Sequence, residues 1–469
     1  MRLPVRLILL FAFSCNALAG LDDLSFGPAP NASSTASAGG GGQGQGAGGT
    51  TPGTDLCVVW TGAEQVRGVY PHGDGFVIAS SFSGTLDFGG EPINSAGDRD
   101  GLVARFGPNC EIIFALPIGG ALEDFVEDVA VLSDGSVIAF GSFNGTTSFG
   151  TSQGDWDHFL FRIDPDGNVM WTKTWGGPGI QQPGRISVGS DDHIYVAGGF
   201  SDSVTIETTT HSALTGDDIH AFELTPDGAL VWSESYGGDM GSARVRGVAV
   251  DTGGNLTISG LFAGTIALSG MSLTSNGNND GFVATLAPGG MAVFATSFGS
   301  DNAASNDYIV DLAVRENGNI VMLAPVRNPM SFGANAFTPR GARDMALIEL
   351  SAVGDVAWAR SFGGPNEETA AGLALDDNRI LVAGAFDGAG DLGGGAIENG
   401  KKRSFFGAVF DENGVFSSAL VAGSAGTHCR GVTIAATGDG DVVAGGGCIG
   451  VIDFAGDERI GGFAVKWTP

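Results

Sequence analysis

The sequence repeats about every 60 residues, and this period restricts the fold more than any other feature. A glycine that usually stands in a Gly-Gly pair recurs at steps of 57, 61, 62, 64 and 60 residues. These glycines are Gly119, Gly176, Gly237, Gly299, Gly363 and Gly423. A second series, in which residues such as Phe82 and Phe88 stand six positions apart, occurs seven times. Such a repeat implies stacked supersecondary units rather than one ordinary core of 469 residues.

Each copy contains four short segments with strand character and none with helical periodicity. In the second copy they are "DVAVL", "SVIAFGSF", "DHFLFRID" and "NVMWTKTW", and tight turns rich in Asp, Gly and Asn join them in pairs. One four-stranded unit is too small to bury both faces, so it must stack on its neighbours. The sequence therefore predicts an all-β fold, a seven-bladed β-propeller of four-stranded antiparallel blades over residues 55–469.

The two ends of the repeated region complement each other. The last copy stops after its third segment, "GGFAVKWTP", whereas "LCVVWTG" at residues 56–62 precedes the first full copy and matches a fourth segment. We therefore expect the N-terminal strand to complete the last blade and close the ring. This closure removes the open sheet edge between the first and last blades.

The repeated elements also resemble a known family. "FSGTLDFGG", a "DG" before an apolar strand, a "DPDGN" turn, a Trp and a terminal Gly-Gly are together similar to the bacterial SBBP-type β-propeller repeats. The resemblance covers about residues 55–469. It implies an exported, often surface-associated propeller, and it supplies no catalytic residues.

Positions that most copies fill alike are expected to serve the scaffold. The fourth-segment aromatics are predicted to pack between blades rather than to stack on a ligand. They are Trp60, Phe114, Trp171, Trp232, Phe294, Trp358 and Phe416. The aspartates that open the third segment are predicted to cap turns through backbone N–H groups, with metal binding as the alternative. They are Asp100, Asp157, Asp218, Asp280 and Asp344.

The N-terminus has the anatomy of an export signal. Arg2 and Arg6 precede the apolar stretch "LILLFAF", so residues 1–19 are predicted to be a signal peptide. "ALA" fits ordinary cleavage, and "FSC" ending at Cys15 is similar to a lipobox, which makes Cys15 the candidate for lipidation. Residues 20–54 are predicted to form a disordered tether rich in Gly, Ser and Ala. We expect an outer-membrane or cell-surface lipoprotein, or alternatively a periplasmic or secreted protein.

The other four cysteines are candidates for two disulfides, because an exported chain meets an oxidising compartment. If the "TGDGD" turn centres a hairpin between Thr437 and Gly440, facing residues have numbers that sum to 877, and Cys429 faces Cys448. By elimination, Cys57 then pairs with Cys110 and fastens the closing strand to the first blade. The alternative is two free or metal-binding thiols.

Composition and motifs exclude several functions. The chain has 22 Lys plus Arg against 52 Asp plus Glu, and the resulting net charge of −30 repels nucleic acid and anionic lipid. Contact with a membrane is therefore expected only through the N-terminal lipid. The sequence has no Walker loop, H-E-x-x-H, G-x-S-x-G or EF-hand pattern, and we expect no metal, no cofactor and a monomer.

The ligand-binding candidates come from loops that differ between copies, because these loops emerge together around one mouth of the central channel. Nine residues at the start of the first segments are the candidates: Arg67, Arg185, Arg246, Arg430, Glu127, Asp307, Tyr308, Glu368 and His428. Guanidiniums around one opening are suited to bind a carboxylate, a sulfate or an acidic glycan. The alternative is that the arginines pair with neighbouring acids and close the channel.

Two classes of function remain. The first is a non-catalytic binding or adhesion module that recognises a glycan, a protein or another component of the cell envelope. The second is a propeller enzyme of the lyase or lactonase type at the same mouth, which needs titratable groups that converge in a pocket. A purely structural envelope protein is the third possibility, and the sequence names no catalytic residue.

Overall fold

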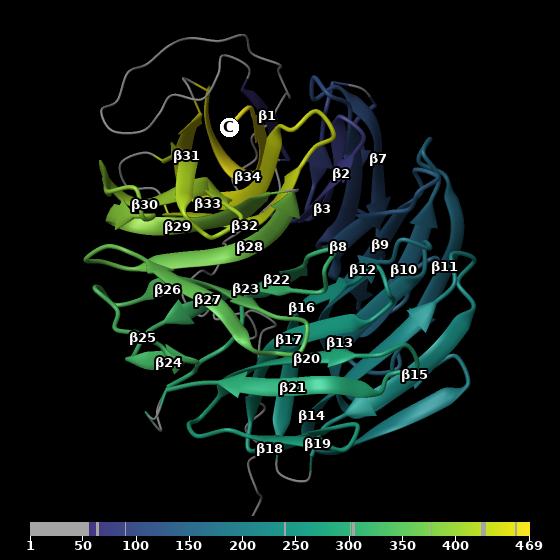
Figure 1. The fold of residues 1–469 in the computed structure, drawn as a ribbon. Coiled ribbons are helices and arrows are strands. Elements are labelled where there is room, and N and C mark those ends of the chain that lie inside the picture. The colour runs from purple at the N-terminus through teal and green to yellow at the C-terminus, as the bar shows by residue number, and fades with distance from the viewer. Residues whose placement is uncertain are drawn as a thin grey trace, which may run out of the picture. The chain divides into compact units, whose positions relative to one another are not determined.

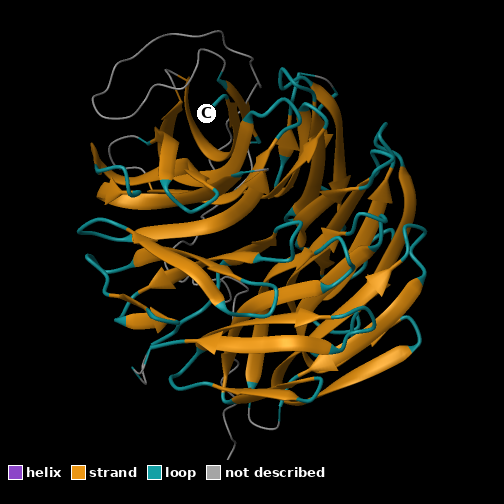
Figure 2. Cartoon of the chain, viewed as in Figure 1, coloured by secondary structure: helices purple, strands orange, loops and turns teal. Residues whose placement is uncertain are grey.

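The computed structural model describes residues 56–61, 65–89, 91–238, 241–300, 302, 305–376, 378–423, 428–454 and 457–469. The predicted signal peptide, Cys15 and the tether lie outside these residues. All regular secondary structure within them is β-strand (Figure 2). Among the described residues we find no helix with the length and apolar character to cross a membrane.

Five separate four-stranded antiparallel sheets occur within the described residues, and each sheet contains the four predicted segments of one repeat. They consist of β2 (Val66–His72), β3 (Gly75–Phe82), β6 (Asp100–Phe106) and β7 (Ile112–Ile118); β8 (Asp124–Val131), β9 (Val137–Phe143), β10 (Asp157–Ile163) and β11 (Val169–Trp175); β12 (Gln181–Val188), β13 (Ile194–Ile206), β14 (Thr209–Leu224) and β15 (Leu230–Tyr236); β16 (Ser242–Val250), β17 (Leu256–Ala263), β20 (Asp280–Leu286) and β21 (Ala292–Phe298); and β22 (Asp311–Val314), β23 (Ile320–Val326), β26 (Asp344–Leu350) and β27 (Val356–Phe362).

Short ribbons project from three of these sheets between the second and third strands. They are β4 (Thr85–Leu86) with β5 (Ile93–Asn94), β18 (Thr265–Leu268) with β19 (Met271–Thr274), and β24 (Met330–Phe332) with β25 (Asn335–Phe337).

The remaining strands form one eight-stranded sheet. It contains β28 (Glu368–Asp376), β29 (Arg379–Asp391), β30 (Ala396–Asp411), β31 (Phe416–Ala422), β32 (His428–Ala436), β33 (Val442–Phe454), β34 (Asp457–Trp467) and β1 (Cys57–Trp60). Two four-stranded antiparallel halves meet in it through one parallel bridge, between Arg403 and His428. The strand β1 pairs antiparallel with β34, which is the closure that the sequence predicts.

The sheets are arranged as a propeller, with the first strand of each unit innermost. In chain order, β2, β8, β12, β16, β22, β28 and β32 each contact the next, and β32 contacts β2. Figure 1 shows the result, because the yellow C-terminal strands lie beside the purple N-terminal ones. Residues far apart in sequence therefore meet at the ends of the innermost strands.

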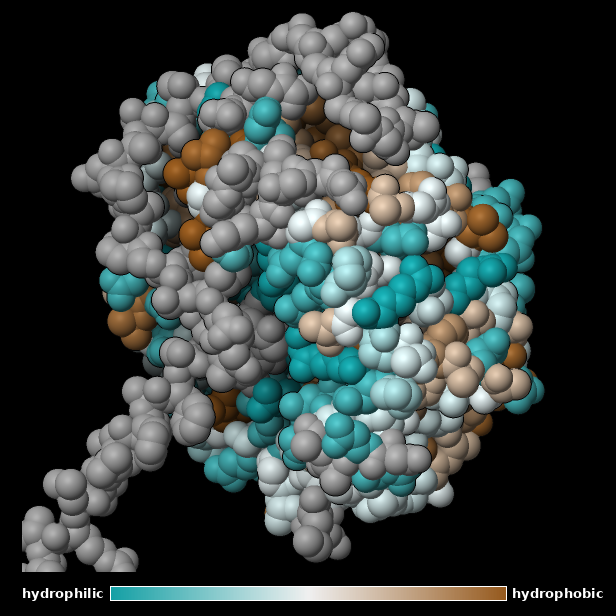
Figure 3. Space-filling view, turned by 90° about the vertical axis from the view of Figure 1, so that its left-hand side faces the viewer, coloured by the Kyte–Doolittle hydropathy of each residue, from teal (hydrophilic) through white to brown (hydrophobic). Residues whose placement is uncertain are grey.

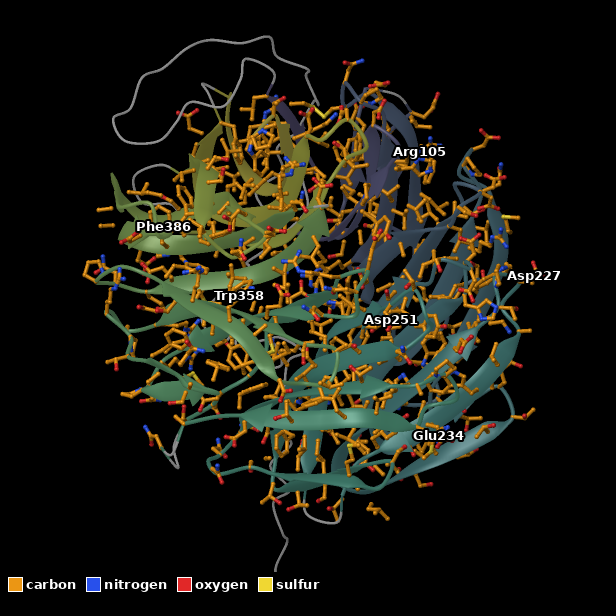
Figure 4. The ribbon with its side chains drawn as sticks, in the orientation of Figure 1. Arg105, Asp227, Glu234, Asp251, Trp358 and Phe386 are labelled. Carbon is orange, nitrogen blue, oxygen red and sulfur yellow. A yellow bond between two sulfur atoms is a disulfide. The ribbon has the colours of Figure 1, made fainter. Side chains whose placement is uncertain are left out.

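The recurring aromatic residues pack between units, as predicted. Phe114 lies against Gly167 in the turn of the next sheet, and Trp358, labelled in Figure 4, lies against Gly414 in the same way. The indole Nε1 of Trp171 donates to the Pro226 carbonyl of the next sheet at 3.2 Å. These contacts recur because the aromatic ring of each unit packs over the turn between the third and fourth strands of the next unit.

The recurring aspartates explain the glycine period. Asp100, Asp157, Asp280 and Asp344 each accept a backbone N–H four residues earlier, at 2.7 to 3.0 Å, which confirms the predicted turn caps. A Cβ atom on the glycine that ends the fourth strand would clash with this carboxyl group, as at Gly176 against Asp157. The glycine recurs because the aspartate occupies the space where its side chain would lie.

Both predicted disulfides are present. Cys429 and Cys448 face each other on β32 and β33 with Cα atoms 4.1 Å apart. Cys57 bonds Cys110, with Cα atoms 6.4 Å apart, and so ties the closing strand β1 to the turn after β6. The alternative of free thiols is wrong for these four cysteines.

The Cys429–Cys448 pairing arises differently from the reason that predicted it. Next to the turn, Ala436 faces Val442, so the numbers of facing residues sum to 878 instead of 877. A β-bulge at Val432 then shifts the register by one residue and brings the two cysteines opposite each other.

Candidate ligand-binding site

The innermost strands present alternate side chains to the channel. On β16, Arg244 and Arg246 are half-buried, whereas the alternate residues Ala243 and Val245 are buried in the sheet. A strand turns successive side chains to opposite faces, so the half-buried set faces the channel. The same alternation on β32 places Arg430 on the channel side.

Arg246 and Tyr308, two of the predicted candidates, are in contact. The Arg246 Cζ atom lies 4.8 Å from the centroid of the Tyr308 ring, which is the geometry of a cation–π contact. Arg246 is on β16 and Tyr308 precedes β22, so the pair joins two neighbouring units. A β-bulge between Val245 and Gly247 turns Arg246 away from the regular ladder.

Arg430 lies among other guanidiniums. Burial and then the positive charge of Arg403 lower the pKa of Arg430 to about 10, and Arg343 and Arg246 act in the same direction. The negative form of Tyr308 would oppose this shift. The charge of Arg246 thus acts on Arg430, although 184 positions separate the two residues along the chain.

Sequence reasoning missed three arginines here: Arg327, Arg343 and Arg403. Arg343 stands directly before the third strand β26, Arg327 follows β23, and Arg403 lies within β30. Arg343 bridges to Glu367 and Arg403 bridges to His428, each at the start of the next unit. The signal was available, because Arg343 directly precedes the recurring Asp344.

Arg67 and Arg185 have different surroundings. The Arg67 Cζ atom lies 4.9 Å from the centroid of the Phe125 ring. Burial raises the pKa of Glu127, and a hydrogen bond from Ser142 and the charges of Arg67 and Arg185 oppose this rise. Glu127 accepts the Ser142 hydroxyl at 2.7 Å. The effect of Arg67 and Arg185 on Glu127 agrees with the alternative in which these arginines interact with neighbouring acids.

Arg185 also interacts with Asp128 and Asp311, and each of these aspartates links two neighbouring units through a hydrogen bond. Asp128 accepts the backbone N–H of Ile186 at 3.1 Å, and Asp311 accepts that of Leu373 at 2.9 Å. Burial raises the pKa of Asp311 to about 7, and the Leu373 N–H and the charge of Arg185 oppose the rise. The charge of Arg185 therefore acts on a residue of a unit that is not its neighbour.

The structure corrects two candidates and places a third. Asp307 is 1% exposed, and it accepts the N–H and hydroxyl of Ser300 at 2.8 and 2.9 Å. Glu368 is 0% exposed. Glu368 occupies a buried, sheet-facing position at the start of β28, and Asp307 precedes β22, so both are buried in the scaffold. His428 lies beside Arg403 at the bridge between the two halves of the eight-stranded sheet.

Two hollows lie elsewhere. One of about 240 Å³ is lined by Tyr195, Glu223 and Asp251 at the opposite, tight-turn end. The other, of about 610 Å³, is lined by Lys173, Glu207 and Asp227 near the outer strands. Figure 4 labels Asp251 and Asp227, the latter at the edge of the molecule. In the part of the chain that the structure describes, no three His, Cys, Asp or Glu side chains are grouped to hold a metal ion.

The face shown in Figure 3 mixes both kinds of surface. Hydrophilic residues gather over its middle, and the hydrophobic areas there are separate patches.

Comparison with known proteins gives solved structures only. No protein-family model and no curated protein matches the chain, so membership in the SBBP-type family stays a prediction. The chain is similar to a protein of unknown function from Dyadobacter fermentans DSM 18053, with 12% identity, TM-score 0.41, and 76% and 97% of the two chains covered. It is also similar to a gluconolactonase from Xanthomonas campestris, with 11% identity, TM-score 0.34, and 71% and 87% covered. The Synechocystis apocarotenoid oxygenase shows 12% identity, TM-score 0.40, and 87% and 93% covered. These low TM-scores assign no activity to the chain.

Proposed function

We propose that the protein is a seven-bladed propeller in which the eight-stranded sheet comprises two blades. One parallel bridge joins its two four-stranded halves, whereas each half is antiparallel throughout. The closed series of innermost strands, one from each repeat, supports the same count. The SBBP-type resemblance fits this architecture.

We further propose that the protein is a non-catalytic binding module whose ligand is anionic. The observation that carries this proposal is the gathering of Arg246, Arg343, Arg403 and Arg430 at one end of the channel. The chain has only 22 Lys plus Arg against 52 Asp plus Glu, so such a gathering opposes its overall composition. Guanidinium forks bind carboxylate, sulfate and phosphate oxygens through charge-assisted hydrogen bonds.

The acids with strongly raised pKa support a binding function over catalysis. Burial raises the pKa of Asp124, Asp311 and Glu368 to about 7 in each case. Backbone N–H groups of the scaffold donate to Asp124 and Asp311, at 2.6 and 2.9 Å. We attribute these shifts to burial within the sheets, and we assign these acids no role in proton transfer.

Export to an oxidising compartment completes the proposal. Two disulfides suit such a compartment, where they persist. Processing of residues 1–19, lipidation at Cys15, display at the cell surface and a monomeric state are parts of the proposal that need direct tests, such as mass spectrometry of the mature N-terminus.

The test is binding to immobilised acidic polysaccharides, with sparsely substituted carboxymethyl dextran and sparsely substituted dextran sulfate as probes and uncharged dextran as the blank. We expect binding to at least one charged probe and a loss of at least about tenfold in Arg246→Ala/Arg430→Ala, because each charge-assisted bond contributes about 1.5–3 kcal/mol.

The matched control is Lys173→Ala/Arg360→Ala, which removes two positive charges from the outer strands β11 and β27. We expect its affinity to stay within about twofold of the wild type. Equal losses in both double variants, with both folded by circular dichroism, would disprove a site at the channel end.

A further inference from the structure

The opening of the channel has two chemically different halves. We call Arg246, Arg327, Arg343, Arg403 and Arg430 the arginine half, and Arg67, Arg185, Glu127, Asp128 and Asp311 the paired half. The paired half contains two arginines and three acids that interact with them. The halves meet where the charge of Arg185 acts on Arg246.

Several positive charges act on one another in the arginine half. Glu367 and Asp387 are acids that interact with arginines of this half. Glu367 pairs with Arg343 at 3.2 Å. Burial lowers the pKa of Arg343, and the charges of Arg327 and Arg403 add to this effect. Like charges are therefore held close together, which costs free energy unless an anion lies among them.

Two of these guanidiniums carry donors that the protein leaves unused. The Nε atoms of Arg327 and Arg343 are buried and have no hydrogen-bond partner among the described residues. A buried donor without an acceptor is unfavourable, because it has lost its hydrogen bond to water. An oxygen atom of a ligand would satisfy these donors.

The guanidiniums are also held in place before a ligand arrives. Arg246 packs on the Tyr308 ring, and Arg403 Nη2 donates to the Thr369 hydroxyl at 2.8 Å. The pairing of Arg343 with Glu367 fixes a third side chain. Side chains that are already ordered lose less conformational entropy on binding.

We infer that the arginine half binds a single sulfate or phosphate ester of a sugar, a specificity that rests on the proposed function. A carboxylate offers two oxygens on one edge, which one guanidinium fork can satisfy. A sulfate or phosphate ester offers three terminal oxygens that point in different directions. Such a group matches guanidiniums that come from four different repeats. The net charge of −30 disfavours a densely charged polymer and therefore favours an isolated ester.

Three sugars that differ only in the group at C6 test this inference: glucose 6-sulfate, glucose 6-phosphate and glucuronate. Titration calorimetry at low ionic strength is expected to show at least about tenfold tighter binding of one of the esters than of glucuronate, a difference of about 1.4 kcal/mol. Whichever ester binds more tightly identifies sulfate or phosphate as the natural group. Inorganic sulfate is expected to compete, and chloride at the same ionic strength is not.

Variants of the two halves give the internal control. Arg327→Gln is expected to weaken binding of the preferred ester by about tenfold, because it removes the charge and the unused donor. Arg67→Gln, in the paired half, is expected to change it by less than about twofold. Thermal unfolding of each variant establishes that it is folded, and Arg343→Lys serves as a second variant, since it keeps the charge and removes the fork.

The outcomes separate this inference from the proposed function. Glucuronate binding as tightly as both esters, with loss in Arg246→Ala/Arg430→Ala, would overturn the ester specificity and leave the anion-binding function intact. No binding of any of the three sugars, together with no binding of the charged dextrans, would overturn both.

Discussion

Two seams between units are held by opposite chemistry. At the closing seam, where β34 and β1 meet the first sheet, a disulfide and a buried lysine join the units: Cys57 bonds Cys110, and Lys466 Nζ lies 2.8 Å from Asp439 and 2.9 Å from the Asp74 carbonyl. At the seam between the second and third sheets, two buried histidines, His158 and His220, lie among aromatic rings.

The difference follows from chain connectivity. The second and third sheets are consecutive in the chain, so the short link between β11 and β12 joins them covalently, and apolar packing is supplemented by hydrogen bonds such as that of the Ile186 N–H to Asp128. The closing seam joins the two ends of the repeated region, and without added bonds the loss of β1 would leave an open sheet edge. Three predictions test this difference between the two seams.

The largest expected effect is loss of the closing disulfide. Cys57→Ser/Cys110→Ser is expected to lower the free energy of unfolding by about 3–4 kcal/mol, since this bond closes a loop of sequence separation 53. Cys429→Ser/Cys448→Ser, with separation 19, is expected to cost about 1 kcal/mol less. Urea unfolding with a fluorescence readout measures both. A greater loss from the Cys429 pair would contradict the special role of the closing seam.

The second effect concerns acid at the histidine seam. Burial lowers the pKa of His158 to about 3 and that of His220 well below its usual value, while the unfolded histidines keep a pKa near about 6.5. Their stabilising effect is therefore complete above about pH 6.5 and is lost as the pH falls toward 3, by up to about 1.4 kcal/mol per pH unit for each histidine.

Phenylalanine does not titrate, so His158→Phe is expected to remove the contribution of His158 to the pH dependence of stability. The loss of unfolding free energy between pH 7 and pH 4.5 is then expected to be smaller by about 2–3 kcal/mol. Guanidinium unfolding at the two pH values measures it, and His72→Gln, at a half-buried site on β2, is the control. An unchanged pH dependence in His158→Phe would mean that this histidine does not limit acid stability.

The smallest effect is expected for the ion pairs of the closing seam. Lys466→Met is expected to cost about 2 kcal/mol, because its side chain is 5% exposed but its partners Asp439 and Asp441 are partly solvated. Thermal unfolding at low and high salt measures the loss. The exposed pair of Lys173 with Glu207 is the comparison, and Lys173→Met is expected to cost at most about 1 kcal/mol. Equal costs would show that burial of Lys466 adds nothing.

The scaffold could be predicted from the sequence because the residues that specify its turns and strands are local and recur in most repeats. The turn that Asp157 caps and the glycine at Gly176 both recur in most copies, so one explanation applied to all of them. The pairing of β1 with β34 followed from a missing fourth segment. The disulfide between Cys429 and Cys448 was predicted, but a bulge at Val432, which no sequence pattern marks, corrected a register that was wrong by one residue.

The candidate site was only partly predictable. Arg246, Arg430 and Tyr308 were found because they stand at the start of first segments. Glu368 stands there too, yet it faces the sheet, because a shift of one position along a strand moves a side chain to the opposite face. Asp307 lies before β22 and is buried by its hydrogen bonds with Ser300 and Ser305.

The repeat, the strands, the turns and the closing of the ends could be inferred from the sequence alone, because each depends on residues near one another in the chain or on a period. Which charges lie close together depends on the packing of the repeats. Arg343 and Arg403 meet Arg430 only when the repeats stack around the channel, and Arg67 meets Glu127 by the same packing. The stacking of the repeats therefore gives the opening of the channel two halves, the arginine half and the paired half.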